Sequence, residues 1–184
     1  MAYFYFDRLD MEKQSCHNLL SSLLTQFSAR SDPFFNILSH LYKAHDNGAR
    51  QPSNKALTQC LKDMLTLPGR GPVYLILDAL DECPNKYGFP SARAQVLDLI
   101  KDLVDLQLPD LHLCVTSRLE VDIRASLEPL ASLVSLYDRS GQKKDIDEYI
   151  RFVVNSNISS IMRTWRDKDK ELVIKTLSER ADGM

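Results

Sequence analysis

Three acidic side chains occur close together in the sequence, at Asp78, Asp81 and Glu82. They come directly after an apolar run at residues 73–77, and such a run is typical of a buried strand. Carboxylate oxygens are hard ligands that bind Mg²⁺ together with water and substrate phosphate oxygens. We therefore interpret Asp78 as a candidate metal ligand, and we expect the three carboxylates to converge at the carboxyl end of this strand.

A basic side chain follows the other strongly apolar run of the chain. Residues 111–116 lead directly into Ser117 and Arg118. A guanidinium group can donate two parallel hydrogen bonds to a phosphate and is always charged. Because parallel strands bring their carboxyl ends to one edge of a sheet, the acidic cluster and Arg118 together predict a magnesium-phosphate site.

Each cluster also has a purely structural interpretation. Carboxylates after a strand often cap a helix or solubilise a loop, and an arginine at a strand end often forms a surface ion pair. The pairing favours the functional interpretation, because the clusters follow the two most apolar runs of the chain. The pattern indicates a site without excluding the structural alternative.

Apolar patterns predict the elements that must position these side chains. The run at 73–77 does not alternate in polarity, which suits a strand covered on both faces. The alternation of strands and helices along the chain predicts an α/β fold with a parallel sheet. Strands are expected at 2–6, 73–77, 111–116 and 133–137, and helices are expected after Ser15, Pro33 and Ser53, through 96–104, near 121–127, at 145–155 and from 167 to about 181.

The composition excludes several classes of protein. A chain of 184 residues that is 44% hydrophobic and 26% charged is typical of a globular protein. Its 23 basic and 25 acidic residues give a net charge of -2, so we expect neither nucleic acid nor a membrane surface as a partner. The four cysteines form no C-x-x-C pair and no secretory leader precedes them, which favours reduced thiols in the cytoplasm and no structural zinc.

The segment at 73–84, VYLILDALDECP, resembles the Walker B segment of NACHT-type NTPases, in which a small residue follows the first Asp. Ala79 occupies that small position. Residues 111–118, LHLCVTSR, are similar to the sensor 1 strand of the same family, residues 3–7 to its second core strand, and residues 180–184 to the helix end before its winged-helix region. The resemblance covers nearly the whole chain and is greatest to fungal NOD-like proteins, including the heterokaryon-incompatibility and nephrocystin-like groups.

This resemblance implies a P-loop-NTPase-like three-layer αβα fold, with Mg²⁺ and ATP or ADP as cofactors. Asp78 would hold Mg²⁺ through water, and Asp81 or Glu82 would polarise the attacking water. Ser117 and Arg118 are the implied nucleotide-binding residues, with Arg118 sensing the terminal phosphate. Members of the family use ATP to switch between a closed monomer and an open oligomer. The implied partners are therefore other copies of the NACHT domain and other domains of the same polypeptide.

One expected motif does not occur in the sequence. A phosphate-binding loop reads G-x-x-x-x-G-K-[ST], yet none of the six glycines is followed by lysine. We therefore expect a NACHT core at 1–140 that lacks its first βα unit, and a helical extension at 141–184 that leads toward an absent winged-helix region. The strand at 111–116 would have an unpaired edge unless the strand at 133–137 closes it. We expect the chain alone neither to bind ATP tightly nor to hydrolyse it at a useful rate.

Three functions remain open at this point. The first is a fragment of an ATP-dependent signalling switch that is inactive alone. The second is a non-catalytic interaction or oligomerisation module that uses the exposed sheet edge or the C-terminal helices. The third is a metal-dependent phosphohydrolase that works without a P-loop, which is less favoured because the acidic motif contains neither His nor Lys.

Overall fold

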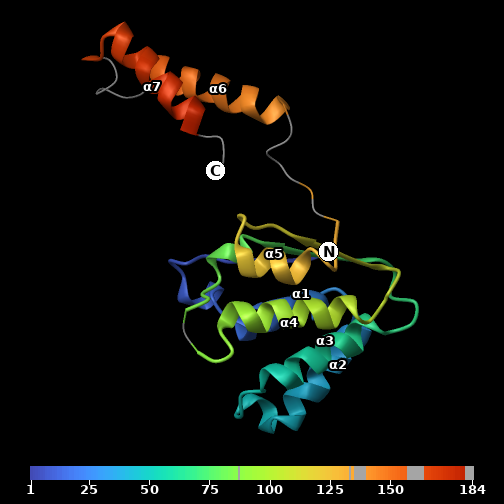
Figure 1. Ribbon diagram of the computed structural model, residues 1–184. Helices are drawn as coiled ribbons and strands as arrows, with labels where there is room; N and C mark the ends of the chain where they lie inside the picture. Colours follow the sequence, from blue (N-terminus) through green and yellow to red (C-terminus); the bar gives the residue numbers. More distant parts are fainter. Residues whose placement is uncertain (87, 133, 135–139, 157–163, 181–184) are drawn as a thin grey trace. The chain divides into compact units, whose positions relative to one another are not determined.

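A computed structural model describes residues 1–86, 88–132, 134, 140–156 and 164–180 (Figure 1). The chain forms two compact units, Met1–Ala131 and Ser132–Met184, which are described separately. None of the helices in the described ranges is both long and apolar enough to cross a membrane.

The first unit is built on a parallel sheet of three strands. These are β1 (Ala2–Tyr5), β2 (Val73–Asp78) and β3 (Leu111–Val115), in the spatial order β1-β2-β3. The strands predicted at 2–6, 73–77 and 111–116 are therefore confirmed. The strand predicted at 133–137 lies outside the described residues, apart from Val134.

Helices form where the apolar spacing predicts them. Serine side chains cap three of these helices: Ser15, Ser53 and Ser91 each accept a hydrogen bond from a backbone N–H of the first turn. The helices of the first unit are α1 (Cys16–Ser28), α2 (Asp32–Ala44), α3 (Asn54–Leu65), α4 (Ala92–Val104) and α5 (Val121–Leu127), with 3₁₀ turns η1 (Met11–Lys13), η2 (Asp46–Gly48) and η3 (Leu80–Glu82).

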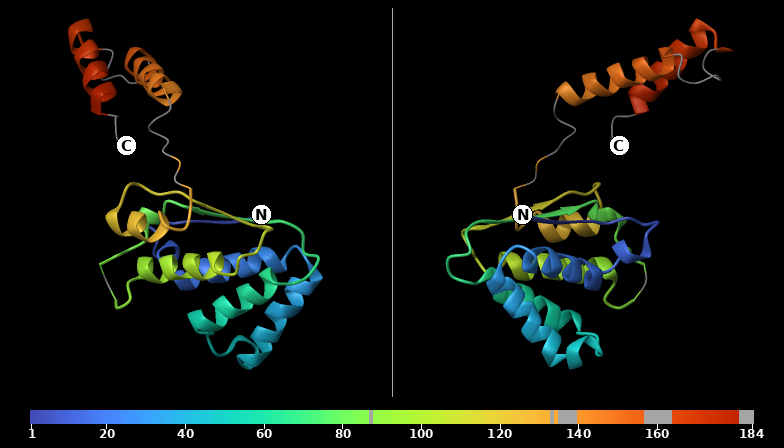
Figure 2. Two further views of the ribbon diagram at one scale, coloured as in Figure 1. Left: turned by 45° about the vertical axis from the view of Figure 1, so that its right-hand side comes forward. Right: turned by 180° about the vertical axis from the view of Figure 1, so that it is seen from behind.

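The helices of the first unit lie on one side of the sheet. Helices α1 and α4 lie directly on one sheet face, and α2 and α3 pack on α1 farther out (Figures 1 and 2). The fold is thus α/β and is consistent with a partial three-layer αβα architecture.

Burial alternates along the strands, and this corrects one expectation. Leu75 and Leu77 are buried in the core. Tyr74, which lies between Val73 and Leu75 in the strand, is 48% exposed. The expectation that this strand is covered on both faces is therefore wrong in the described first unit, because its covering helices lie on one side. On β1, Phe4 is likewise buried and Tyr3 is exposed.

The second unit contains two helices, α6 (Ser140–Asn155) and α7 (Asp167–Arg180). Val154 and Ile174 are its buried apolar residues within the described part of the unit. Polar contacts also join the helices, including a hydrogen bond of 2.7 Å from Ser178 Oγ to Asp147 Oδ1. The helices predicted at 145–155 and from 167 are therefore confirmed, although the first of them begins five residues earlier.

Candidate functional site

A sharp backbone turn presents the acidic residues after β2. Ala79 adopts the left-handed conformation, with φ 55° and ψ 46°, and η3 follows directly. A small side chain is better accommodated there than a bulky or β-branched one, which explains why a small residue suits this position. The Ala79 N–H donates to Thr116 Oγ1 at 3.0 Å, and the Leu80 N–H donates to the Thr116 carbonyl at 2.9 Å. The turn is therefore attached to the end of β3.

Asp78 lies at the carboxyl end of β2 and is exposed. The Thr116 hydroxyl donates a hydrogen bond to Asp78 Oδ1, while the Asp78 carbonyl accepts one from the Phe6 N–H at 3.0 Å. The side chain of Asp78 therefore reaches solvent with a second oxygen group, the Thr116 hydroxyl, beside it. Both are hard oxygen groups, as magnesium chemistry requires.

The side chain of Asp81, unlike that of Asp78, is buried, and it contacts Arg118. Its side chain is only 5% exposed, and Oδ1 accepts a hydrogen bond of 3.0 Å from the Arg118 N–H. Asp81 Oδ2 also lies 3.6 Å from Arg118 Nε. The Arg118 side chain remains 69% exposed, so its guanidinium pairs with Asp81 and still faces solvent.

The side chains of Glu82 and Ser117 each form a hydrogen bond with a backbone group. Glu82 Oε2 accepts a hydrogen bond from the Arg8 N–H at 3.1 Å, and Ser117 Oγ donates to the Arg118 carbonyl at 2.8 Å. Within the described ranges, no three His, Cys, Asp or Glu side chains form a group that could hold a metal ion. The expected convergence of three carboxylates is therefore wrong, because each carboxylate is directed to a different protein donor.

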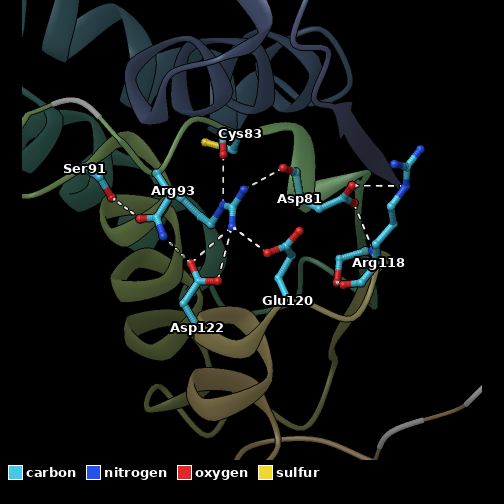
Figure 3. Close-up of polar contacts among 9 residues, drawn as sticks. Asp81, Cys83, Ser91, Arg93, Arg118, Glu120 and Asp122 are labelled. Carbon is cyan, nitrogen blue, oxygen red and sulfur yellow. Dashed lines mark hydrogen bonds and ion pairs between the residues drawn. The ribbon is translucent and has the colours of Figure 1, made fainter.

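The structure adds Arg93, which the sequence interpretation missed. Arg93 is a charged residue in the first turn of α4 and is only 7% exposed. Figure 3 shows that Arg93 and Arg118 reach Asp81 from opposite sides. A signal for it exists in the sequence, since Arg93 precedes Val96, Leu97 and Ile100 at the spacing of one helix face. A charged residue on an otherwise apolar face indicates a buried ion pair.

Thr116 is the second residue that sequence interpretation missed. Its side chain joins Asp78 to the Ala79 N–H, so it connects the ends of two neighbouring strands. The sequence shows a threonine at the end of an apolar run, but nothing in that pattern distinguishes a bridging hydroxyl from an ordinary β-branched strand residue.

Cys83 also adjoins the site, but its environment makes it unreactive. Burial raises the pKa of the Cys83 thiol to about 12, although the nearby Arg93 guanidinium opposes the increase. The thiolate form needed for nucleophilic chemistry is therefore scarce at neutral pH. Cys83 serves as a packing residue within the core.

Comparison with known proteins identifies a family. The family model described as "Nephrocystin 3, N-terminal" matches residues 1–118 of the 184 residues. Searches of curated proteins and of solved structures give no significant match. The matched region includes all three strands and every candidate site residue from Asp78 to Arg118. The chain belongs to the nephrocystin 3 N-terminal family.

Proposed function

We propose that the chain is part of an ATP-dependent signalling switch of the NACHT NTPase class, with its nucleotide-facing residues at the carboxyl edge of the sheet. On this proposal residues 1–140 form the NACHT core and residues 141–184 a helical extension. The observation that carries the proposal is the attachment of the acidic turn to the end of β3, where Asp81 contacts Arg118. The carboxyl edge of a parallel sheet is where α/β proteins bind ligands.

The residues at this edge suit a magnesium-bound nucleotide. Asp78 and the Thr116 hydroxyl supply oxygen groups at an exposed position, and Mg²⁺ held there would neutralise phosphate charge. The solvent-facing guanidinium of Arg118 is suited to a phosphate oxygen. Asp81 is buried and paired with Arg118, whereas Glu82 is less buried. Glu82 is therefore the better placed of the two candidates for polarising water.

The same residues explain why this chain alone should bind nucleotide weakly. It contains no G-x-x-x-x-G-K-[ST] loop to supply backbone N–H groups and a lysine to the phosphates. We expect no micromolar affinity for ATP in calorimetry with Mg²⁺, and no useful rate of hydrolysis. Micromolar affinity that disappears in Asp78→Ala would contradict this expectation.

The site itself is tested with Mn²⁺, whose binding is followed by electron paramagnetic resonance in the presence and absence of ATP. We expect weak binding that is strengthened by ATP and is abolished by Asp78→Asn. Thr116→Val removes the hydroxyl that bonds to Asp78, and should weaken binding about tenfold, as loss of a group that orients a metal ligand does.

Matched variants separate the site from a general charge effect. Asp105→Asn makes the same charge change at an exposed residue that ends α4, and should leave Mn²⁺ binding unchanged. Arg118→Gln should remove the strengthening by ATP, whereas Arg124→Gln, on the exposed surface of α5, should not. Equal binding by wild type and Asp78→Asn would disprove the proposed site.

A second candidate function is a protein-interaction or oligomerisation module. One specific observation favours it: the sheet face opposite α1 and α4 carries Tyr3, Tyr5 and Tyr74, each about half exposed at 52%, 45% and 48%. Exposed apolar patches are typical of protein contact sites. Size-exclusion chromatography with light scattering tests it, since a defined oligomer supports the module and a monomer at all concentrations opposes it.

A further inference from the structure

Arg93 has no role in the chemistry proposed above, yet its guanidinium group forms hydrogen bonds through all of its nitrogens. Its Nε donates to the Cys83 carbonyl at 2.9 Å, and its Nη2 donates to the Asp81 carbonyl at 2.6 Å. Its Nη1 donates to both carboxylate oxygens of Asp122, at 3.2 and 3.3 Å, and lies 4.0 Å from Glu120 Oε2. All three guanidinium nitrogens are therefore used (Figure 3).

These contacts join two segments that both belong to the site. The first is the acidic turn, residues 79–83, whose carbonyls accept from Arg93. The second is the segment at 118–122, which follows β3 and begins α5. That segment is held at both ends: the Arg118 N–H bonds to Asp81 Oδ1, and the Asp122 carboxylate bonds to Arg93.

The surroundings of Arg93 are themselves restrained. Asn85 Nδ2 donates to Asp122 Oδ2 at 2.8 Å, and Ser91 Oγ donates to Asn85 Oδ1 at 2.8 Å. Ser91 in turn accepts from the Ala94 N–H, as the cap of α4. The carboxylate that faces Arg93 is thus oriented by the loop before α4, and a buried charge with this many partners holds one geometry.

We propose that Arg93 is a positioning residue that sets the acidic turn against Arg118. Its guanidinium nitrogens are occupied by protein acceptors, and it acts through the carbonyls of the turn and the carboxylate of Asp122. The consequence for nucleotide binding rests on the proposed function, but the positioning itself does not. Since the guanidinium bonds in three directions, a lysine at position 93 would keep the charge and lose the geometry.

Amide hydrogen exchange of the free chain tests the positioning without any ligand. In Arg93→Lys we expect exchange at residues 79–83 and at Arg118 to become about ten- to a hundredfold faster, the range that corresponds to losing a hydrogen bond to a charged group. Exchange in α3 should not change. Asp122→Asn keeps one acceptor for Arg93 and should give a smaller effect in the same residues, which provides a milder variant if Arg93→Lys does not fold.

Two controls separate positioning from a loss of overall stability. Cys60→Ala removes a buried group in α3, away from the turn, and should speed exchange throughout the core. Arg124→Gln removes another arginine of the same region, one that is exposed and paired with Glu128, and should change nothing in the turn. Unchanged exchange in Arg93→Lys, or an increase spread evenly over α3 and the turn, would overturn the proposal.

Binding of Mn²⁺ with ATP then tests the link to function. We expect Arg93→Lys to weaken it about tenfold, although Asp78 and Thr116 are intact. Absence of Mn²⁺ binding in the wild-type chain would count against the proposed function, and the exchange comparison would still decide whether Arg93 positions the turn.

Discussion

The two faces of the sheet differ sharply, although both are built from strands of mostly apolar residues. One face carries Phe4, Leu75 and Leu77 into a core closed by α1 and α4. The other carries Tyr3 and Tyr74, which remain about half exposed in the structure. Apolar composition therefore does not by itself decide burial: the side on which the covering helices lie decides it.

The cysteines follow the same division. Cys16, Cys60 and Cys83 belong to the buried core, whereas Cys114 on β3 is exposed. Burial raises the pKa of the Cys16 and Cys60 thiols to about 11 and that of Cys83 to about 12. The thiols therefore provide a chemical test of which face is covered.

The largest effect is expected from removing a side chain on the covered face. Leu75→Ala should lower the free energy of unfolding by about 2–5 kcal/mol, because it leaves a cavity at a residue only 1% exposed. Urea unfolding measures the change. Tyr74→Ala at the neighbouring residue is the matched control and should cost clearly less; an equal cost would mean that the second face is covered in solution.

The next largest effect is expected at high pH, where ionisation of the buried thiols should lower the free energy of unfolding. Unfolded thiols ionise near pH 9, whereas the buried thiols keep their protons to about pH 11 or 12. Over this interval the folded state binds more protons, so the free energy of unfolding falls as pH rises, by about 1.4 kcal/mol per pH unit for each thiol. Below about pH 9 the thiols are protonated in both the folded and the unfolded state, so the stability that the neutral buried thiols allow is fully present there.

Unfolding at pH 8 and pH 10 measures this slope. Tyrosine and lysine also titrate in that range, so the informative comparison is with Cys16→Ala, which removes one buried thiol. This variant should reduce the fall in the free energy of unfolding between pH 8 and pH 10 by about 1.4 kcal/mol in total, nearly all of it above pH 9. An identical slope in the variant would show that Cys16 is not buried as the structure describes.

A smaller effect is expected for the aromatic contact on the exposed face. The Tyr74 and His112 rings are stacked, with centroids 4.7 Å apart and planes 18° from parallel. A double-mutant cycle with Tyr74→Ala and His112→Ala should give a coupling of about 0.5–1.5 kcal/mol, toward the lower end because both residues are exposed. Zero coupling would mean that the two rings do not meet in solution.

The smallest effect on stability is expected at Cys114. Alkylation with iodoacetamide at pH 8 should modify Cys114 readily and leave the free energy of unfolding almost unchanged, because the thiol is exposed. The three buried thiols should react only after denaturation. Mass spectrometry identifies the modified cysteine, and protection of Cys114 in the native chain would indicate that a second molecule covers this face.

Much of the fold could be predicted from local patterns. The three strands at 2–6, 73–77 and 111–116 follow from apolar runs, and the helices that begin after Ser15 and Ser53 follow from capping and apolar spacing, both of which are local properties. The contact between the acidic turn and Arg118 follows from one general rule, that parallel strands end at the same edge of a sheet.

The direction of each side chain at the site could not be predicted in this way. Asp78, Asp81 and Glu82 are neighbours in sequence, and their types indicate one shared task. Their positions in the fold give each a different donor: the Thr116 hydroxyl, the Arg118 N–H and the Arg8 N–H. These donors come from distant parts of the chain, so only their arrangement in space separates the three carboxylates.

The sequence by itself determined the order of strands and helices, the parallel α/β class and the edge at which the acidic and basic groups meet, because these depend on periodicity and chain direction. The tertiary structure alone decided which sheet face is buried, that Asp81 is paired rather than free, and that Arg93 lies between the acidic turn and Asp122. The reason is physical: burial and the pairing of a buried charge depend on groups far apart in the chain.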